Sequence, residues 1–263
     1  MYSIYNLFKL ASSNNNRFDN LALLLKEAVD RADRPAKERS PEVIERYLRR
    51  SLERGSGTVA LKDLVEKFNS STESDRYNIS NKISDIDMSI FDLKYPQENF
   101  STDSETVMES LDLDQGPHGF YLHPHGDENN ICGYIYGSNA LNHIDYDDID
   151  LFGDLLKDYT ISNYKEIIKD LKSGNVFYVE NLAVTGDCGG NGARLMLELV
   201  RKLKNTNFKY IYAEFLQDSY EIIKAAKSTN KFQELGIQII IDEPNAMDEG
   251  AIYPRAKVLL KIK

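Results

Sequence analysis

The chain has 263 residues, of which 41% are apolar and 28% are charged, a composition typical of a folded globular protein. Its formal net charge of −10 disfavours a general affinity for nucleic acids or other polyanions. No apolar run approaches the roughly 20 residues of a membrane-spanning helix, and the first residues lack the apolar core of a secretory signal. No membrane partner is therefore expected.

Cysteine is scarce, since only Cys132 and Cys188 occur. Two thiols supply neither a disulfide framework nor a four-cysteine metal site, so no metal is expected. A reducing cytoplasm is the simplest compartment for such a chain. The abundance of Asn, Lys and Ile is consistent with an AT-rich genome, such as that of a phage or a low-GC bacterium.

The first third of the chain is predicted to be helical. Apolar residues recur at the spacing of an amphipathic helix in three segments: 20–34, 41–54 and 61–68. The polar stretch 69–81 that follows is the best candidate for a linker. We therefore expect a helical N-terminal extension over residues 1–75 and a second domain over residues 76–263.

From about residue 83 the pattern indicates a mixture of helices and strands. Apolar residues predict a strand over 86–93, and a weak helical pattern follows over 101–108. Two β-prone runs, 119–125 and 130–137, are separated by turn residues and predict a hairpin. A further helical region is expected over 146–172.

The most informative segment contains a strand, a glycine-rich loop and a helix in succession. The run NVFYVENLAV (175–184) has high β-propensity. TGDCGGNGA (185–193) forms the loop, and RLMLELVRKL (194–203) has the apolar stripe of an amphipathic helix. The elements expected after it are a strand over 208–216, helices over 219–226 and 231–235, and strands over 237–243 and 256–263.

A glycine-rich loop between a strand and a helix is typical of an anion-binding site. Glycines let several backbone N–H groups turn toward one point, and the helix N-terminus adds partial positive charge. A Walker loop would require Lys followed by Ser or Thr, whereas here Gly192 is followed by Ala193 and Arg194. The spacing of a dinucleotide-binding loop is also absent. The pattern thus indicates a phosphate or pyrophosphate carried by another cofactor.

These residues resemble the acetyl-CoA site of the GNAT superfamily of N-acetyltransferases. The similarity lies in YVENLAV (178–184) and in the loop and helix start GNGARLML (190–197). KFQELGI (231–237) resembles an aromatic-Tyr-Glu-x-Leu-Gly-Phe stretch of the same family. The similarity covers the chain from about residue 83 onward and does not extend to the N-terminal segment.

The resemblance implies a mixed α+β fold, with a central twisted, mostly antiparallel sheet flanked by helices and a helical insertion at about 140–172. In this family a splayed pair of parallel strands makes room for the pantetheine of acetyl-CoA. Backbone groups of Leu182 and Val184, on either side of Ala183, would pair with the pantetheine amides. The residues that would hold the pyrophosphate are Gly189, Gly190, Asn191, Gly192, Ala193 and Arg194.

The resemblance also implies a reaction, the transfer of an acetyl group from acetyl-CoA to a primary amine by direct attack. An ammonium group must first lose a proton to a base within hydrogen-bond reach. Glu180 is the candidate general base, and Tyr220 is the candidate acid for the leaving thiolate. Two positions depart from the family pattern: Phe232 replaces a Tyr that often acts as this acid, and Cys188 or Asp187 stands where a basic residue is usual. Direct transfer needs no acyl-enzyme, so Cys188 is interpreted as a small residue in a tight loop.

The acceptor is predicted to be a cationic amine, either a small molecule or a protein lysine or N-terminus. Residues 95–156 contain 13 acidic residues and no Lys or Arg, and a negative surface attracts cations and repels RNA. A nucleic-acid partner is therefore disfavoured. Members of this family often dimerise, so a homodimer is a further expectation.

Two alternatives stay open. The four histidines, His118, His123, His125 and His143, lie in the acidic segment, but their spacing matches no metal-binding motif. They are interpreted as surface residues or as part of an acceptor pocket. For the whole chain, the alternative to an enzyme is a catalytically inactive GNAT-fold protein that only binds a partner, and the residues at positions 188 and 232 favour this alternative.

Overall fold

The computed structural model describes residues 59–92, 95, 102–113, 116–143, 156, 161–185, 188, 191–216, 220, 223–224, 231–246 and 252–263. All of them belong to one compact unit, which spans Pro41–Lys263. The helices expected over 20–34 and 41–54 lie outside the described residues, as does most of the helix expected over 219–226. The N-terminal extension over residues 1–75 therefore stays a prediction.

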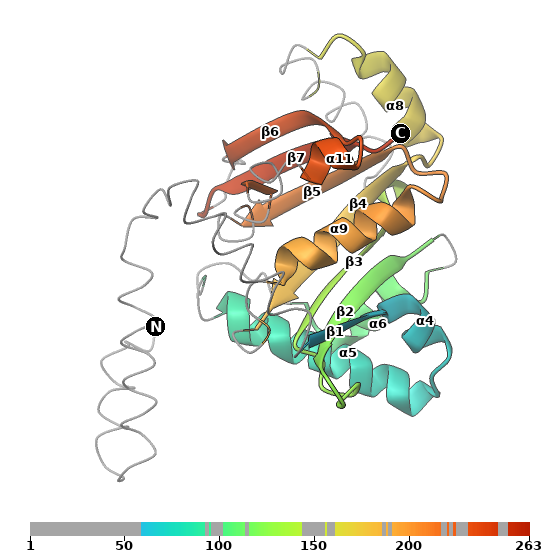
Figure 1. Cartoon of the computed structure of the whole chain (residues 1–263), viewed down its shortest axis with the longest axis vertical. Helices are drawn as coiled ribbons and strands as arrows, with labels where there is room; N and C mark the ends of the chain where they lie inside the picture. The colour runs from blue at the N-terminus through green and yellow to red at the C-terminus, as the bar shows by residue number, and fades with distance from the viewer. Residues whose placement is uncertain are drawn as a thin grey trace, which may run out of the picture. The chain divides into compact units, whose positions relative to one another are not determined.

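The described strands form one seven-stranded sheet in the order β1-β2-β3-β4-β5-β7-β6 (Figure 1). They are β1 (Val59–Asp63), β2 (His118–Pro124), β3 (Gly133–Asn139), β4 (Val176–Val184), β5 (Tyr210–Leu216), β6 (Gln238–Ala246) and β7 (Arg255–Lys261). All neighbouring strands are antiparallel except β4 and β5, which run parallel. The predicted α+β class with a mostly antiparallel sheet is confirmed.

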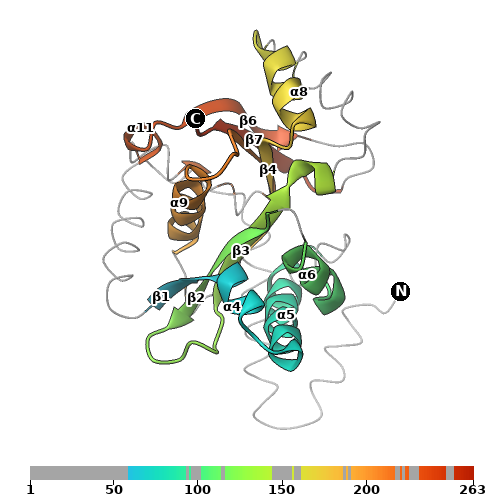
Figure 2. The same ribbon diagram turned by 90° about the vertical axis from the view of Figure 1, so that its right-hand side faces the viewer.

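The helices cover both faces of the sheet (Figure 2). They are α4 (Leu64–Asn69), α5 (Glu73–Asp87), α6 (Ser104–Leu111), α8 (Tyr164–Lys172), α9 (Gly192–Leu203) and α11 (Lys231–Glu234), with a π-helical turn η1 (Met88–Asp92) and a 3-10 turn η2 (Ala140–Asn142). The apolar stripe of α9 and Phe232 of α11 pack on one face of the sheet. The helices α4, α5, α6 and α8 pack on the other face.

Most elements of the second domain are confirmed. The expected hairpin is β2 and β3, and the strand–loop–helix segment is β4 followed by α9. The helices expected over 101–108 and 231–235 are α6 and α11, and the last part of the helical region over 146–172 is α8. The three strands expected after α9 are β5, β6 and β7.

The prediction for residues 61–81 was wrong in two respects. Leu61 lies in β1, which pairs with β2, and the helix begins only at Leu64 because the Asp63 carboxylate accepts a hydrogen bond from the Glu66 amide at 3.0 Å. The polar stretch 69–81 is not a linker, since it contains the end of α4, a short turn and the first part of α5. Thr72 caps that helix, and its apolar side chains pack against the sheet.

The strand predicted over 86–93 was also wrong. Its residues form the end of α5 and the π-helical turn η1. Ile86 and Phe91 are buried in the same apolar cluster as Tyr134 of β3. The apolar pattern was real, but tertiary packing rather than local propensity selected a helical conformation for it.

A β-bulge interrupts the pairing of β3 with β4. Tyr136 is opposite Asn181, whereas Gly137 is opposite Val179, so Glu180 is the extra residue in β4. A bulge changes the face to which the following side chains point. Phe177 and Val179 therefore contact α9 before the bulge, and Leu182 does so after it.

We expect Gly137→Ala to destabilise the fold at this bulge. A Cβ atom on Gly137 would lie 2.0 Å from the backbone oxygen of Tyr178, which forces β3 and β4 apart. The expected loss is about 1–3 kcal/mol of unfolding free energy, measurable by urea denaturation. Gly126→Ala is the control, because it has no atom within 4 Å and only a positive φ to accommodate, at about 1 kcal/mol. Equal losses in both variants would contradict the steric argument.

Candidate functional site

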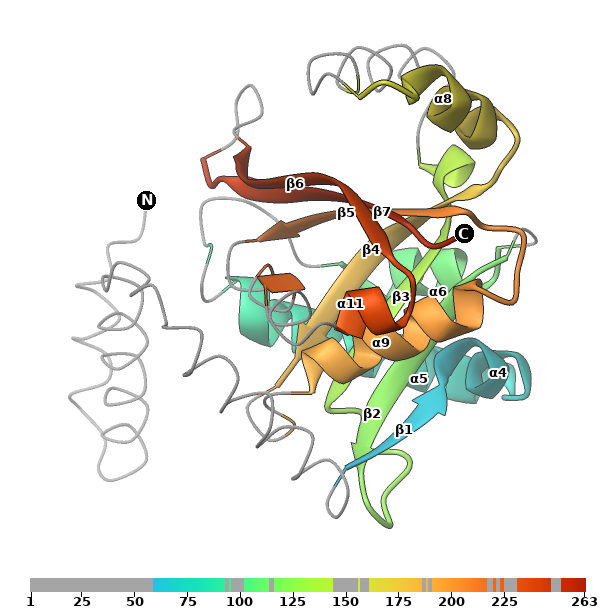
Figure 3. The ribbon, with the colours of Figure 1, turned by 45° about the horizontal axis from the view of Figure 1, so that its top comes forward.

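The parallel strands β4 and β5 separate partway along their length. Their pairing runs from Val176 with Tyr210 to Val179 with Ala213 and then stops. Beyond that point β4 continues beside β3, and β5 continues beside β7. The two strands thus diverge toward their carboxyl ends (Figure 3), and Glu180 is the first β4 residue past the last pair.

The second half of β4 presents backbone groups on the side of this divergence. The Thr185 amide donates to the Cys132 carbonyl at 2.9 Å, so the backbone N–H group of Thr185 points toward the start of β3. Backbone direction alternates along an antiparallel strand, which turns the N–H and C=O groups of Leu182 and Val184 away from β3. They face the side of β4 from which β5 diverges after the last pair of the two strands.

The loop after β4 leads directly into the N-terminus of α9. Gly189 and Gly190 lie outside the described residues, whereas Asn191 is the N-cap residue and Gly192 the first residue of the helix. The Asn191 side chain does not cap the helix but donates from Nδ2 to the Cys188 carbonyl at 3.0 Å. The first turn of a helix offers N–H groups without intrahelical partners. The first turn of α9 here begins with Gly192 and Ala193.

The Arg194 side chain points elsewhere. Its Nη1 donates to the Val59 carbonyl of β1 at 3.0 Å. This contact ties α9 to the edge strand of the sheet. Any role of Arg194 at a pyrophosphate therefore falls to its backbone amide.

A disulfide joins the loop to the start of β3, which the sequence analysis did not anticipate. Cys132 and Cys188 are bonded, with their Cα atoms 5.7 Å apart and their positions separated by 56 in sequence. Thr185 reinforces the link, because its amide and its hydroxyl both donate to the Cys132 carbonyl at 2.9 Å. Cys188 is thus a covalent anchor of the loop, beyond the small residue expected at that position.

Glu180 lies on the face of the sheet opposite α9, next to His143. The Glu180 Oε1 atom is 3.1 Å from His143 Nε2, and the Glu180 side chain is 11% exposed. The His143 ring packs against Tyr178 with 5.0 Å between ring centroids. Of the four histidines, His143 is therefore the one that lies in contact with Glu180, the candidate base.

Two tyrosines adjoin Glu180. Burial raises the pKa of Tyr178 to about 12, and Glu214 and Glu180 add to this effect. Burial also raises the pKa of Tyr136 well above its usual range, with further contributions from Glu180 and Asp87. Both phenols therefore keep their protons at neutral pH.

Polar contacts fix the strands on both sides of Glu180. Asn181 Nδ2 donates to the Asp87 carboxylate, which also accepts from the Thr102 amide at 3.3 Å. On β5, Glu214 accepts from the Tyr212 hydroxyl at 2.7 Å and lies 3.5 Å from Arg255 Nη1. A second carboxylate thus stands beside the divergence, but it is paired with a cation.

The structure places Tyr220 beside Asp242 of β6, whose carboxylate accepts the Tyr220 hydroxyl proton. Lys224 Nζ lies 5.3 Å from the centre of the tyrosine ring. Because a carboxylate already accepts its proton, Tyr220 would have to exchange this partner before it could protonate a thiolate. Phe232 is buried and carries no proton to donate.

The remaining histidines do not converge. His118 contacts the rings of Phe177 and Phe208, and its pKa is lowered by burial and by Lys202. His123 is buried next to Tyr121. Within the described ranges no group of three or more His, Cys, Asp or Glu side chains could hold a metal ion.

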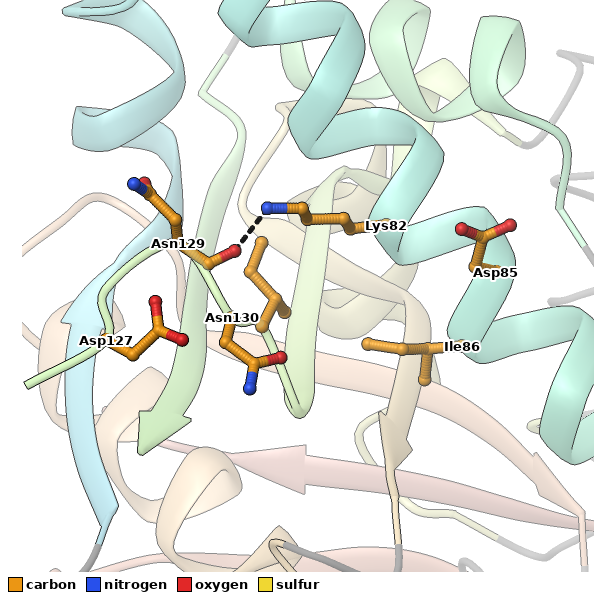
Figure 4. A pocket seen from close by; sticks show the side chains of 7 residues that line it. Lys82, Asp85, Ile86, Asp127, Asn129 and Asn130 are labelled. Carbon is orange, nitrogen blue, oxygen red and sulfur yellow. Dashed lines mark hydrogen bonds between the residues drawn. The ribbon is translucent and has the colours of Figure 1, made fainter. Parts of the chain in front are cut away.

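A hollow of about 380 Å³ lies between α5 and the turn that joins β2 to β3 (Figure 4). Lys82 reaches across it and donates to the backbone oxygen of Asn129. Neither Glu180 nor the start of α9 lines this hollow. It therefore lies outside the candidate site. None of the described helices is long and apolar enough to span a membrane.

No protein-family model matches the sequence, and no curated protein does either. Among solved structures, the chain is similar to an aminoglycoside 6'-acetyltransferase type Ii, with 16% identity over 78% of this chain and 97% of that one and a TM-score of 0.42. It is also similar to the ribosomal-protein-S18-alanine N-acetyltransferase from Escherichia coli, with 13% identity over 78% and 95% and a TM-score of 0.40. A third is yncA, a putative acetyltransferase from Salmonella typhimurium solved with its cofactor acetyl-CoA, with 9% identity over 78% and 94% and a TM-score of 0.46. A function for this chain has to be argued from its own site residues.

Proposed function

We propose that the chain is an acetyl-CoA-dependent N-acetyltransferase that acts on a primary amine, with Glu180 as the general base. The observation that carries the proposal is the divergence of β4 from β5 directly before Glu180. Among the described strands, none then pairs with Leu182 and Val184 on the side of β5. An extended chain with amide groups, such as pantetheine, has the hydrogen-bonding pattern to take that place.

The loop and the N-terminus of α9 follow β4 and supply the second requirement. Backbone amides of Gly192, Ala193 and Arg194, with the glycines before them, would hold the pyrophosphate at the positive end of the helix. Acetyl-CoA contributes an activated thioester. A backbone N–H of the Leu182–Val184 segment would polarise its carbonyl group.

Glu180 would then take the proton from the acceptor ammonium and so expose the amine lone pair. The carboxylate is nearly buried and lies 3.1 Å from His143 Nε2. Its charge, together with Glu214 and Asp87 nearby, favours a cationic acceptor. A polyamine, an aminoglycoside-like amine, a lysine side chain or a protein N-terminus would meet this requirement.

Titration calorimetry with acetyl-CoA tests the proposal. We expect binding in the micromolar range, and S-acetylpantetheine serves as the matched ligand that lacks the pyrophosphate. If the loop and α9 hold that group, S-acetylpantetheine should bind at least tenfold more weakly, since each charge-assisted hydrogen bond contributes about 1.5–3 kcal/mol. No binding of acetyl-CoA at millimolar concentration would remove the proposal.

The second candidate function is a catalytically inactive protein that keeps the binding site. It is favoured by Phe232, which cannot donate a proton, and by Cys188, which is held in a disulfide where a basic residue is usual in the family. Binding of acetyl-CoA without release of its thiol to any amine would support this alternative. The cytoplasmic location and the homodimer also stay predictions, since nothing in the described residues tests them.

A further inference from the structure

The hydrogen bonds of Asn181 allow one step beyond the proposed function. Asn181 follows the bulged residue Glu180 in β4, and its side chain reaches the end of α5. Its Nδ2 atom donates to Asp87 Oδ2 and, at 3.3 Å, to the Thr102 hydroxyl. Asp87 is fully buried, and its Oδ2 atom also accepts from the Thr102 amide at 3.3 Å. Asp87, Thr102 and Asn181, which we call the Asp87 clamp, therefore join α5, the chain before α6, and β4 beside the candidate base.

The clamp engages both side-chain N–H groups of Asn181. A carboxamide nitrogen carries two hydrogens, and its two acceptors here are Asp87 and Thr102. The Asn181 amide nitrogen is thus committed to the fold and not to a substrate. Any influence of Asn181 on the reaction must therefore pass through a neighbouring residue, and the nearest in the chain is Glu180.

Glu180 has no strand partner on either side within the described sheet. The pairing of β4 with β3 passes from Val179 to Asn181 and leaves Glu180 out, and the pairing with β5 ends at Val179. The ladder does not hold the extra residue of a bulge, so its backbone depends on the residues on both sides. Val179 is paired with both neighbouring strands, whereas Asn181 is held by β3 and by the clamp.

The clamp also determines where the bulge lies. Val179 and Leu182 pack toward α9, whereas Glu180 and Asn181 both face away from it. If the bulge moved one residue later in β4, the Asn181 side chain would turn toward α9. Asp87 would then lose this donor, which is costly for a fully buried carboxylate. The hydrogen bond between Asn181 and Asp87 therefore favours the bulge at Glu180.

We propose that Asp87 and Asn181 are positioning residues for Glu180, an inference that rests on the proposed function. The clamp fixes the backbone at the bulge and so sets the direction in which the Glu180 carboxylate meets the acceptor ammonium. A general base acts only within hydrogen-bond reach of the proton, and a misplacement of about 1 Å can cost about 10²-fold in rate. Asp87 and Asn181 neither gain nor lose a proton in this step.

Asn181→Ala tests the clamp, with acetyl-CoA and spermidine as the probe amine. We expect kcat to fall about tenfold, whereas the affinity for acetyl-CoA should change less, because Leu182 and Val184 pair with β3 beyond the bulge. Asn175→Ala is the matched control. It removes a similar bond before the start of β4, where Asn175 Nδ2 donates to the buried Asp170 at 3.1 Å, and it should leave kcat unchanged. Equal kcat values in the two variants, both shown to be folded by circular dichroism, would overturn the proposal.

Combined variants separate an action through Glu180 from a general loss of structure. In Glu180→Gln no base is left to position, so the addition of Asn181→Ala should lower kcat much less than it does in the wild type. A loss of the same size in both backgrounds would overturn the positioning role.

The conservative variant Asp87→Asn tests whether the clamp acts by its geometry. It keeps an oxygen that can accept from Asn181, so it should retain most of the activity, whereas Asp87→Ala should resemble Asn181→Ala. Equal losses of kcat in the two Asp87 variants would contradict a role of the clamp in holding the bulge.

Proton NMR of the full chain tests the position of Glu180 without any substrate. The wild type should show nuclear Overhauser contacts between the Glu180 side chain and the His143 ring, since Glu180 Oε1 lies 3.1 Å from His143 Nε2. We expect these contacts to weaken in Asn181→Ala and to persist in Asn175→Ala. Contacts that stay unchanged in Asn181→Ala would overturn the inference. A wild-type chain that binds acetyl-CoA but acetylates no amine would overturn the proposed function instead, and the NMR contacts would still show whether the clamp positions Glu180.

Discussion

Glu180→Gln should lower the kcat of acetyl transfer by about 10²–10⁴-fold, the usual contribution of a general base. The amide has nearly the same shape as the carboxylate but cannot accept a proton from an ammonium group. The variant leaves the backbone groups of Leu182 and Val184 unchanged, so the affinity for acetyl-CoA should stay the same. Release of the CoA thiol in the presence of an amine measures the first effect, and calorimetry measures the second.

The matched control for this variant is Glu214→Gln. Glu214 also lies beside the divergence of β4 and β5, but it is engaged by Tyr212 and Arg255. We expect Glu214→Gln to change the KM for a cationic acceptor more than kcat, since it removes only a distant charge. The assignment of the base would be wrong if Glu180→Gln left turnover unchanged from acidic to alkaline pH, or if both variants lost kcat equally.

Reduction of the bond between Cys132 and Cys188 should lower the unfolding free energy by about 2–4 kcal/mol. The bond closes a loop of 56 residues that includes β3, α8 and β4, and opening it gives the unfolded chain more freedom. The loop before α9 should also become less ordered, which would weaken the binding of acetyl-CoA. Urea denaturation with and without a thiol reductant measures the first effect.

The double variant Cys132→Ser, Cys188→Ser is the control, because it should behave like the reduced wild type and respond to no reductant. A stability that does not depend on reductant in the wild type would show that the bond is absent in solution. Disulfides are rare in reducing compartments. The same measurement therefore bears on the cytoplasmic location, which stays a prediction.

The segment that carries the candidate site was predictable because its signals are local. The β-prone run of β4, the glycines and the apolar stripe of α9 each specify their structure within about ten residues. Residues 86–93 were mispredicted because their apolar pattern fits a strand as well as a buried helical turn. Only the packing of Ile86 and Phe91 under β3 decides between the two.

Pairings between distant residues could not be predicted from one sequence. Glu180 was recognised from its place before Leu182, but its contact with His143 depends on a bulge that inserts one residue into β4. The pairing of Cys132 with Cys188 likewise depends on how the start of β3 meets the loop after β4. Neither the bulge in β4 nor the contact between the two cysteines produces a periodic pattern of apolar residues in the sequence.

The position of β7 between β5 and β6 has a consequence for how the molecule assembles. β6 precedes β7 in the chain, and among the described strands it pairs with β7 only. During synthesis, β6 thus leaves the ribosome before the strand that can receive it has been made. The ladder between β6 and β7 therefore cannot form until the last strand of the described sheet has been synthesised.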